Sequence, residues 1–332
     1  MARISTLHTK ETSMTCIGLD VGHSAVKMAW RGKNGKIKRK IFPSVAVPAM
    51  TITDNEASDQ AKKETVTVNG LEYFFGETAV HEVGSMAVTG LHDRWLEMPE
   101  FQALVQGAIN IVKDDTGVIH SVTAGLPPSI FSDQNLKLRN IISLCTDAEV
   151  RVHQEPAGVA MQNRLDESGI MIPDSTGDLG VVAIGRYTTD FMAMLDGRWV
   201  QGAAGSARGM SRAANLVMRK LNEQGYKIDY LDADDALWKK SIKYNGANND
   251  VTPVVEIALH VLASEIFDAT SARFGDTGRK MEKILVAGGG AGLMFDGLKK
   301  YWPQAVLVED PRFAVAEGFR RAGEGLWNIR NK

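Results

Sequence analysis

The segment CIGLDVGHSAVKMAW, Cys16 to Trp30, has residue types and spacing suited to phosphate chemistry. Two apolar stretches flank a turn with glycine, hydroxyl and basic side chains, which predicts a strand, a tight turn and a second strand. Backbone N–H groups and hydroxyls in such a turn can donate hydrogen bonds to phosphate oxygens. The candidate contacts here are Gly22, His23, Ser24 and Lys27.

Asp20 ends the first of these two strands. A carboxylate at a strand tip beside a triphosphate can hold the water shell of Mg²⁺ or orient an attacking water. The alternative is a turn carboxylate that bonds only to its own backbone.

A second segment, LGVVAIGRYTTDFMAML, repeats the pattern from Leu179 to Leu195. Its candidate phosphate contacts are Gly185, Arg186 and Thr188, and we expect Asp190 to fix the hairpin rather than touch a ligand. The place that Asp20 holds in the first segment belongs here to Ala183, so one carboxylate is missing. Two such hairpins predict two related domains that grip one polyphosphate from opposite sides.

A third glycine turn, Gly288, Gly289 and Gly290, follows the apolar run KILVA and precedes a predicted helix. Glycine lets a backbone approach a ligand because it has no Cβ, so a flat ring such as adenine can lie against this turn. Plain packing of a strand on a helix gives the same pattern. Gly205, just before the helix predicted over 206–224, is a further candidate at the nucleotide.

The elements that must position these residues indicate an α/β fold with two similar halves, each with a mixed sheet flanked by helices around a cleft. We predict one domain over 15–170 together with 311–330, a second over 171–310, and a disordered extension over 1–14. Residues 66–79 predict a hairpin that turns at Asn69-Gly70. The polar residues 50–65 predict a surface loop, 198–205 a strand, and the acidic residues 229–237 a solvated helix start.

Taken in order, five motifs resemble the actin and sugar-kinase superfamily, and most closely the bacterial actin-like plasmid-segregation ATPases of the ParM/StbA group. They are IGLDVGHSAVK (17–27), HQEPAGVA (153–160), VVAIGRYTTDF (181–191), ILVAGGGA (284–291) and VEDPRFAVAEGF (308–319). The resemblance spans roughly residues 15 to 325. It implies an ATPase, with ATP or GTP and Mg²⁺ as ligands, that forms head-to-tail filaments and moves plasmid DNA through a DNA-binding adaptor.

The resemblance also implies roles for single residues. Glu155 would orient the attacking water, although a glutamate before a helix is also a routine helix-start charge. Asp20 would hold Mg²⁺ through water. The segregation ATPases usually carry Asp at the place of Ala183, so this chain is expected to bind nucleotide but to hydrolyse it slowly. The sequence leaves open whether this alanine is natural.

Three other functions occur on the same fold. A small-molecule kinase would need a carboxylate base for a substrate hydroxyl, and no further Asp in a distinctive turn stands out. A chaperone-type ATPase would need a separate substrate domain. A membrane-linked relative would need an anchor, and two glycines weaken the closing segment in that role.

Composition excludes several classes of protein. The 332 residues are 44% hydrophobic and 23% charged, which is ordinary globular composition. The formal net charge of −2 gives no global basic field, so direct binding to nucleic acid is not expected. No apolar run approaches the ~20 residues of a bilayer span. Cys16 and Cys145 are expected as free thiols in a reducing cytoplasm, where we place the protein.

Overall fold

The two glycine-centred segments form β-hairpins in the computed structural model, which describes residues 14–83 and 94–330. In the first hairpin, β1 (Cys16–Val21) runs antiparallel to β2 (Ala25–Arg31). In the second, β9 (Leu179–Ile184) runs antiparallel to β10 (Thr188–Leu195). Each hairpin supplies the first two strands, in chain order, of its own mixed sheet.

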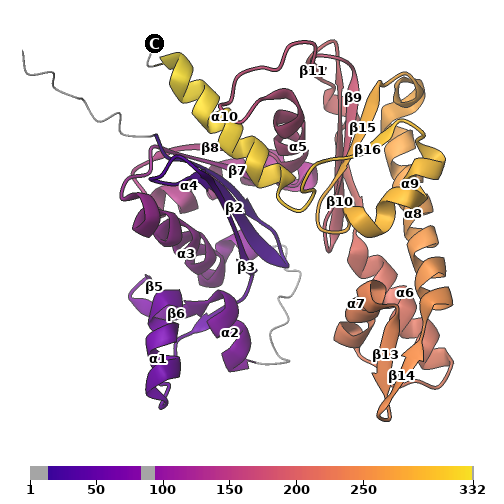
Figure 1. The fold of residues 1–332 in the computed structure, drawn as a ribbon, viewed down its shortest axis with the longest axis horizontal. Coiled ribbons are helices and arrows are strands. Elements are labelled where there is room, and N and C mark those ends of the chain that lie inside the picture. The colour runs from indigo at the N-terminus through magenta and orange to yellow at the C-terminus, as the bar shows by residue number, and fades with distance from the viewer. Residues whose placement is uncertain (1–13, 84–93, 331–332) are drawn as a thin grey trace, which may run out of the picture.

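The two sheets have the same strand order (Figure 1). The first is β3 (Ile37–Pro43), β2, β1, β7 (Ser121–Leu126) and β8 (Glu149–Gln154). The second is β11 (Arg198–Trp199), β10, β9, β15 (Lys283–Ala287) and β16 (Ala305–Leu307), with β12 (Gly205–Arg208) paired to β10. In both, the strands that follow the hairpin are parallel to its first strand. This repeat confirms the predicted α/β fold of two similar halves.

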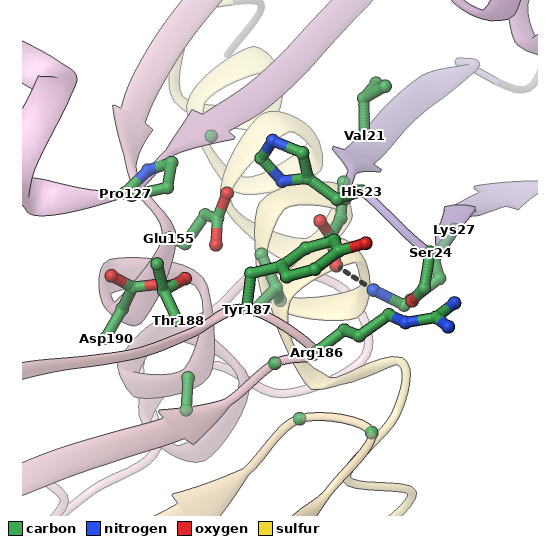
Figure 2. A pocket seen from close by; sticks show the side chains of 18 of the residues that line it. Val21, His23, Ser24, Lys27, Pro127, Glu155, Arg186, Tyr187, Thr188 and Asp190 are labelled. Atoms are coloured by element: carbon green, nitrogen blue, oxygen red, sulfur yellow. Dashed lines mark hydrogen bonds and ion pairs between the residues drawn. The ribbon is translucent and has the colours of Figure 1, made fainter. Parts of the chain in front are cut away.

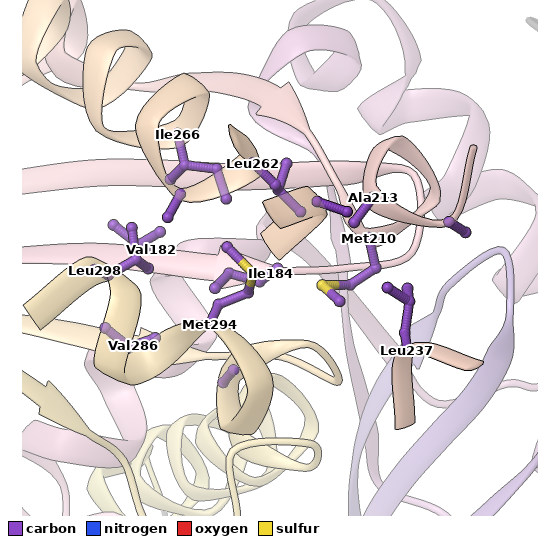
Figure 3. Packing of buried hydrophobic residues seen from close by; sticks show 14 of the residues in the cluster. Val182, Ile184, Met210, Ala213, Leu237, Leu262, Ile266, Val286, Met294 and Leu298 are labelled. Atoms are coloured by element: carbon purple, nitrogen blue, oxygen red, sulfur yellow. The ribbon is translucent and has the colours of Figure 1, made fainter. Parts of the chain in front are cut away.

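Helices cover both sheets and bury their apolar stripes. The first sheet packs with α3 (Pro99–Thr116) and α4 (Pro128–Cys145). The second packs with α6 (Met210–Glu223), α8 (Thr252–Phe274) and α9 (Ala291–Tyr301). Figure 3 shows Val182 and Ile184 of β9 enclosed by apolar side chains from these three helices.

Each half also carries a smaller addition (Figure 1). In the first half it consists of β4 (Ala46–Pro48), β5 (Thr65–Val68), β6 (Leu71–Phe75), α1 (Asn55–Ala61) and α2 (Gly76–Val83). In the second it consists of α7 (Tyr230–Lys239), β13 (Ser241–Tyr244) and β14 (Ala247–Asp250). The turn predicted at Asn69-Gly70 is confirmed, since both residues have positive φ, 51° and 80°.

Two helices, α5 (Glu155–Arg164) and α10 (Ala314–Arg330), cross between the sheets with almost no space between their backbones. A Cβ at Gly318 would lie 1.7 Å from the carbonyl oxygen of Gly158, and one at Gly18 would lie 1.8 Å from that of Ala316. Only glycine allows these approaches. The crossing therefore fixes α10 against both α5 and β1.

A buried ion-pair network holds α10 to the first sheet. The Arg320 side chain has no exposed surface and pairs with Glu317 at 2.7 Å and with Glu324 at 2.8 Å. Glu324 also pairs with Arg31 of β2 at 2.8 Å. Removal of one partner would leave a buried charge uncompensated, so we expect this network to tolerate little change.

The division into 15–170 with 311–330, and 171–310, stays a prediction, and the packing of α10 on β1 and α5 supports it. Residues 1–13, most of the predicted extension, lie outside the described residues. Among the residues that are described, no helix has the length and apolar character of a bilayer span.

Three local expectations are wrong. The loop predicted at 50–65 contains α1, whose start is capped by the Asp54 side chain. The strand predicted at 198–205 is only β11 followed by a 3-10 turn. The helix predicted from residue 206 begins at Met210, because 205–208 pairs with β10 as β12.

Candidate functional site

A cavity of about 560 Å³ opens where the two hairpins and the turn after β15 meet (Figure 2). Its volume is within the range of ordinary small-molecule sites. The candidate residues that line it are Asp20, Gly22, His23, Ser24, Lys27, Glu155, Ala183, Gly185, Arg186, Thr188, Gly288, Gly289 and Gly290. The fold therefore brings together segments that are far apart in sequence.

Gly205 is the exception among the candidates. It lies in β12 and does not line the cavity. A Cβ at this position would lie 2.9 Å from the ring of Phe191, so the glycine serves close packing inside the second half. Gly205 was therefore predicted wrongly as a nucleotide contact: a glycine is needed at this position because of packing against Phe191.

The first hairpin presents opposite charges to the cavity. Asp20 and Lys27 are cross-strand partners, and their Oδ2 and Nζ atoms are 2.8 Å apart. The Gly22 carbonyl accepts a hydrogen bond from the Ser44 hydroxyl, which fixes the turn. This arrangement offers a cation for a phosphate and an anion for a metal ion at one place.

The second hairpin is tied to the start of α6. The Gly185 N–H donates to the Thr188 carbonyl at 2.8 Å and closes the turn. The N–H groups of Met210 and Ser211 donate to the carbonyls of Gly185 and Arg186 at 3.0 and 2.6 Å. These hydrogen bonds fix the phosphate-type turn to the start of α6.

Asp190 lies directly across the hairpin from Ala183. Its Oδ2 accepts from the Thr188 hydroxyl at 2.8 Å and its Oδ1 from the Ser206 hydroxyl at 2.5 Å. Both oxygens are therefore engaged in holding β10, the preceding turn and β12 together.

Three carboxylates line the cavity: Glu155 and Asp190, which Figure 2 shows, and Asp20. Burial raises the pKa of Glu155 well above its usual range, and the charges of Asp20 and Asp190 raise it further. Burial also raises the pKa of Asp190 to about 6, with Asp20 adding to it. A divalent cation here would relieve this repulsion, but no three of the described Asp, Glu, His or Cys side chains are grouped so as to hold a metal ion directly, which leaves contact through water.

The glycine turn after β15 combines one strained and one open position. Gly288 has φ of 91°, and a Cβ there would lie 2.4 Å from the carbonyl oxygen of Ile184. A Cβ at Gly290 would meet the Met210 side chain at 2.6 Å, whereas one at Gly289 would meet nothing within 4 Å. The turn is packed on one side and open to the cavity at Gly289.

Residues 18–161 match the model of the N-terminal domain of actin-like proteins, and residues 181–300 match that of the C-terminal region of archaeal MreB-like actin homologues. The archaeal actin homologue Ta0583 is 21% identical with a TM-score of 0.73, over 94% of this chain and 99% of that one. The protein has the actin-like fold.

Two bacterial structures agree with this actin-like fold. ParM from a 15-stranded filament of Clostridium botulinum is 20% identical, with a TM-score of 0.72 over 94% of this chain and 99% of that one. Bacillus thuringiensis ParM with ATP is 14% identical, with a TM-score of 0.63 over 96% of this chain and all of that one. The archaeal homologue has also been solved in complex with ADP. No curated protein sequence matches the chain significantly.

The actin-like cleft also contains aromatic residues that the sequence did not indicate. His23 of the first hairpin stacks on Trp95 at 5.8 Å and meets Tyr187 of the second hairpin edge-on at 5.5 Å. Burial lowers the pKa of His23. The neutral imidazole therefore joins the two hairpin tips across the cleft, a contact that no local spacing could reveal.

Arg186 bonds to α7 in addition to lining the cavity. Its guanidinium lies 3.2 Å from Asp234 and 3.4 Å from the hydroxyl of Tyr230. Asp234 and Trp238 of the same helix line the cavity and were also missed. The acidic segment that we expected as a solvated helix start thus has one face toward the site.

The raised pKa of Asp190 predicts a pH dependence of stability. Its value of about 6 exceeds the value near 3.9 of an unfolded chain, so the folded state binds this proton more tightly. The contribution of Asp190 to the free energy of unfolding is therefore fully present below pH 4. About 3 kcal/mol of it is lost as the pH rises to 6.

Urea unfolding of the nucleotide-free protein between pH 4 and pH 7 tests this. The Asp190→Asn variant should lose less stability over this interval than the original chain does. Parallel profiles of the two proteins would contradict the assignment.

Proposed function

We propose that this protein is a nucleotide-dependent, filament-forming ATPase that segregates plasmid DNA through an adaptor protein. One observation carries the proposal. Two phosphate-type hairpins, one from each half of an actin-like fold, face a single cavity. A nucleotide held there would contact both halves and set the angle between them.

The ligand that fits best is ATP, or GTP, with Mg²⁺. The turn N–H groups around Gly22 and Gly185, with the Ser24 and Thr188 hydroxyls and Lys27, are suited to the phosphates. The open face of Gly289 is suited to a flat base. Mg²⁺, held through water by Asp20, would neutralise charge on the phosphates.

Hydrolysis is proposed to be slow. Glu155, at the N-terminus of α5, would orient the attacking water. The end of β9, which faces the same space, carries only the methyl group of Ala183. Since Asp190 is bonded through both oxygens, it does not replace the missing carboxylate.

Filament formation follows from head-to-tail contacts between unlike surfaces, which do not close on themselves. Only one angle between the halves should suit such a contact, so assembly should depend on the nucleotide. With a formal net charge of −2, the chain is proposed to reach DNA in the cytoplasm through a DNA-binding adaptor.

Light scattering and pelleting with ATP, ADP or no nucleotide test the proposal. We expect pelleting only with nucleotide and Mg²⁺, filaments by electron microscopy, and slow disassembly with ATP. A chain that stays monomeric at tens of micromolar with ATP, yet phosphorylates a metabolite, would establish the small-molecule kinase instead.

A further inference from the structure

Arg312 lies in the short segment between β16 and α10, and its exposed side chain lines the cavity between the two hairpins. The backbone of this segment is fixed from both halves of the fold. On one side, the Pro311 carbonyl accepts a hydrogen bond from the Gly288 N–H at 2.7 Å. On the other side, the Asp310 carboxylate pairs with Arg39 of β3 at 3.0 Å. The function proposed above gives the Arg312 side chain no role.

Arg312 differs from the other lysine and arginine side chains that line this cavity. Lys27 lies 2.8 Å from the Asp20 carboxylate. Arg186 lies 3.2 Å from the Asp234 carboxylate. With the residues of 14–83 and 94–330, the Arg312 side chain makes no hydrogen bond and no ion pair. A guanidinium has five N–H donors in a planar fork and no acceptor, so these donors are available to a ligand in the cavity.

The position of Arg312 favours contact with the base of a nucleotide. The preceding residue, Pro311, is bonded to Gly288, the first residue of the glycine turn against which the base is proposed to lie. The phosphate contacts are proposed at the other two turns, around Gly22 and Gly185. We therefore place the Arg312 donors at an edge of the base.

The two purine bases differ in what they present to such a group. Guanine has two neighbouring acceptors, O6 and N7, and one arginine side chain can donate to both at once. Adenine has N7 beside the N6 amino group, which is itself a donor. An arginine at this edge of adenine would therefore make one hydrogen bond and place a second donor against the amino group.

We propose that Arg312 makes this site select guanine over adenine nucleotides, by donating hydrogen bonds to O6 and N7 of the base. The inference rests on the proposed function and chooses between the two ligands, ATP and GTP, that it allows. The other contacts proposed for the nucleotide do not discriminate. The hairpin turns meet phosphates that ATP and GTP share, and the open face of Gly289 suits any flat base.

Calorimetry with GDP and ADP in the presence of Mg²⁺ tests the selection without hydrolysis. We expect the original chain to bind GDP more tightly than ADP by about tenfold or more, as for a bidentate contact to one base. Arg312→Met removes the donors but keeps a long side chain, so the affinity for GDP should fall to that for ADP. Arg139→Met, at an exposed arginine of α4 that does not line the cavity, is the matched control and should keep the preference for GDP.

An altered base identifies the atom that Arg312 contacts. 7-Deaza-GDP has a carbon in place of N7 and is otherwise the same as GDP. It should bind the original chain about tenfold more weakly than GDP, because one hydrogen bond to a charged group is lost. The Arg312→Met variant should bind GDP and 7-deaza-GDP equally.

Each contrary result has a separate meaning. If neither GDP nor ADP binds, the proposed nucleotide site is wrong. If both bind and the original chain has no preference or prefers ADP, the site stands and this inference is wrong. The inference is also wrong if Arg312→Met keeps the preference for GDP, or if it lowers both affinities equally. In the last case the side chain contacts the phosphates or the ribose, which the two nucleotides share.

Discussion

The Gly289→Leu variant is expected to bind nucleotide more weakly than the original chain by more than about tenfold. A Cβ at this position meets no atom within 4 Å, and the residue lines the cavity between the two hairpins. A leucine side chain would therefore occupy the space proposed for the nucleotide without disturbing the protein around it.

The neighbouring glycines make this a specific experiment. Gly292 of α9 also has open space at its Cβ but does not line the cavity, so Gly292→Leu is a matched control that should keep full affinity. Gly288 is unsuitable, because its positive φ and the nearby Ile184 backbone make any side chain a defect of the fold. If calorimetry gives equal affinities for the Gly289 variant and the original chain, the nucleotide does not bind against this turn.

The glycine turns made much of the fold predictable from the sequence. At Gly22, Gly185 and Gly288 the backbone passes close to other atoms. Glycine suits such positions, so the turns can be recognised in the sequence. The apolar stretches beside them predicted the hairpins. A repeated pattern in the two halves of the chain then predicted two similar sheets.

Contacts between segments that are far apart in the sequence could not be predicted in this way. Arg186 was expected at the phosphates, and its pairing with Asp234 of α7 depends on where that helix packs. The contact of His23 with Trp95 and Tyr187 depends on the placement of both halves.

Two local predictions were also wrong, because the same residue types occur in more than one kind of secondary structure. The helix predicted over 206–224 begins later, because the Ser206 hydroxyl bonds to Asp190 and the Ser206 backbone belongs to β12. Residues 50–65 are polar enough for a loop, and a single cap at Asp54 suffices to start α1. These errors moved helix boundaries but left the predicted cavity wall intact apart from Gly205.

The Ala183→Asp variant is expected to release phosphate faster than the original chain by a factor of about 10²–10⁴. Ala183 lies at the end of β9, lines the cavity and is 7% exposed. Its partner across the parallel strand pair is the small residue Ala287, and its partner across the hairpin is Asp190. The new carboxylate would act on Mg²⁺-bound or attacking water beside Glu155.

The same substitution should cost stability when the site is empty. Asp20, Glu155 and Asp190 already repel one another, as the raised pKa values of Glu155 and Asp190 indicate. A fourth carboxylate adds to this repulsion until Mg²⁺ and nucleotide neutralise it. Melting temperatures should therefore rise more on addition of Mg²⁺ and ATP for the variant than for the original chain.

Ala183→Asn separates charge from size. It adds a side chain of the same shape as Asp without a negative charge, so phosphate release should stay slow and the stabilisation by Mg²⁺ should stay small. Nucleotide affinity of the Asp variant should remain within about an order of magnitude, because turn N–H groups supply most phosphate contacts. If the original chain already hydrolyses ATP as fast as the Asp variant, the carboxylate missing at Ala183 does not limit hydrolysis.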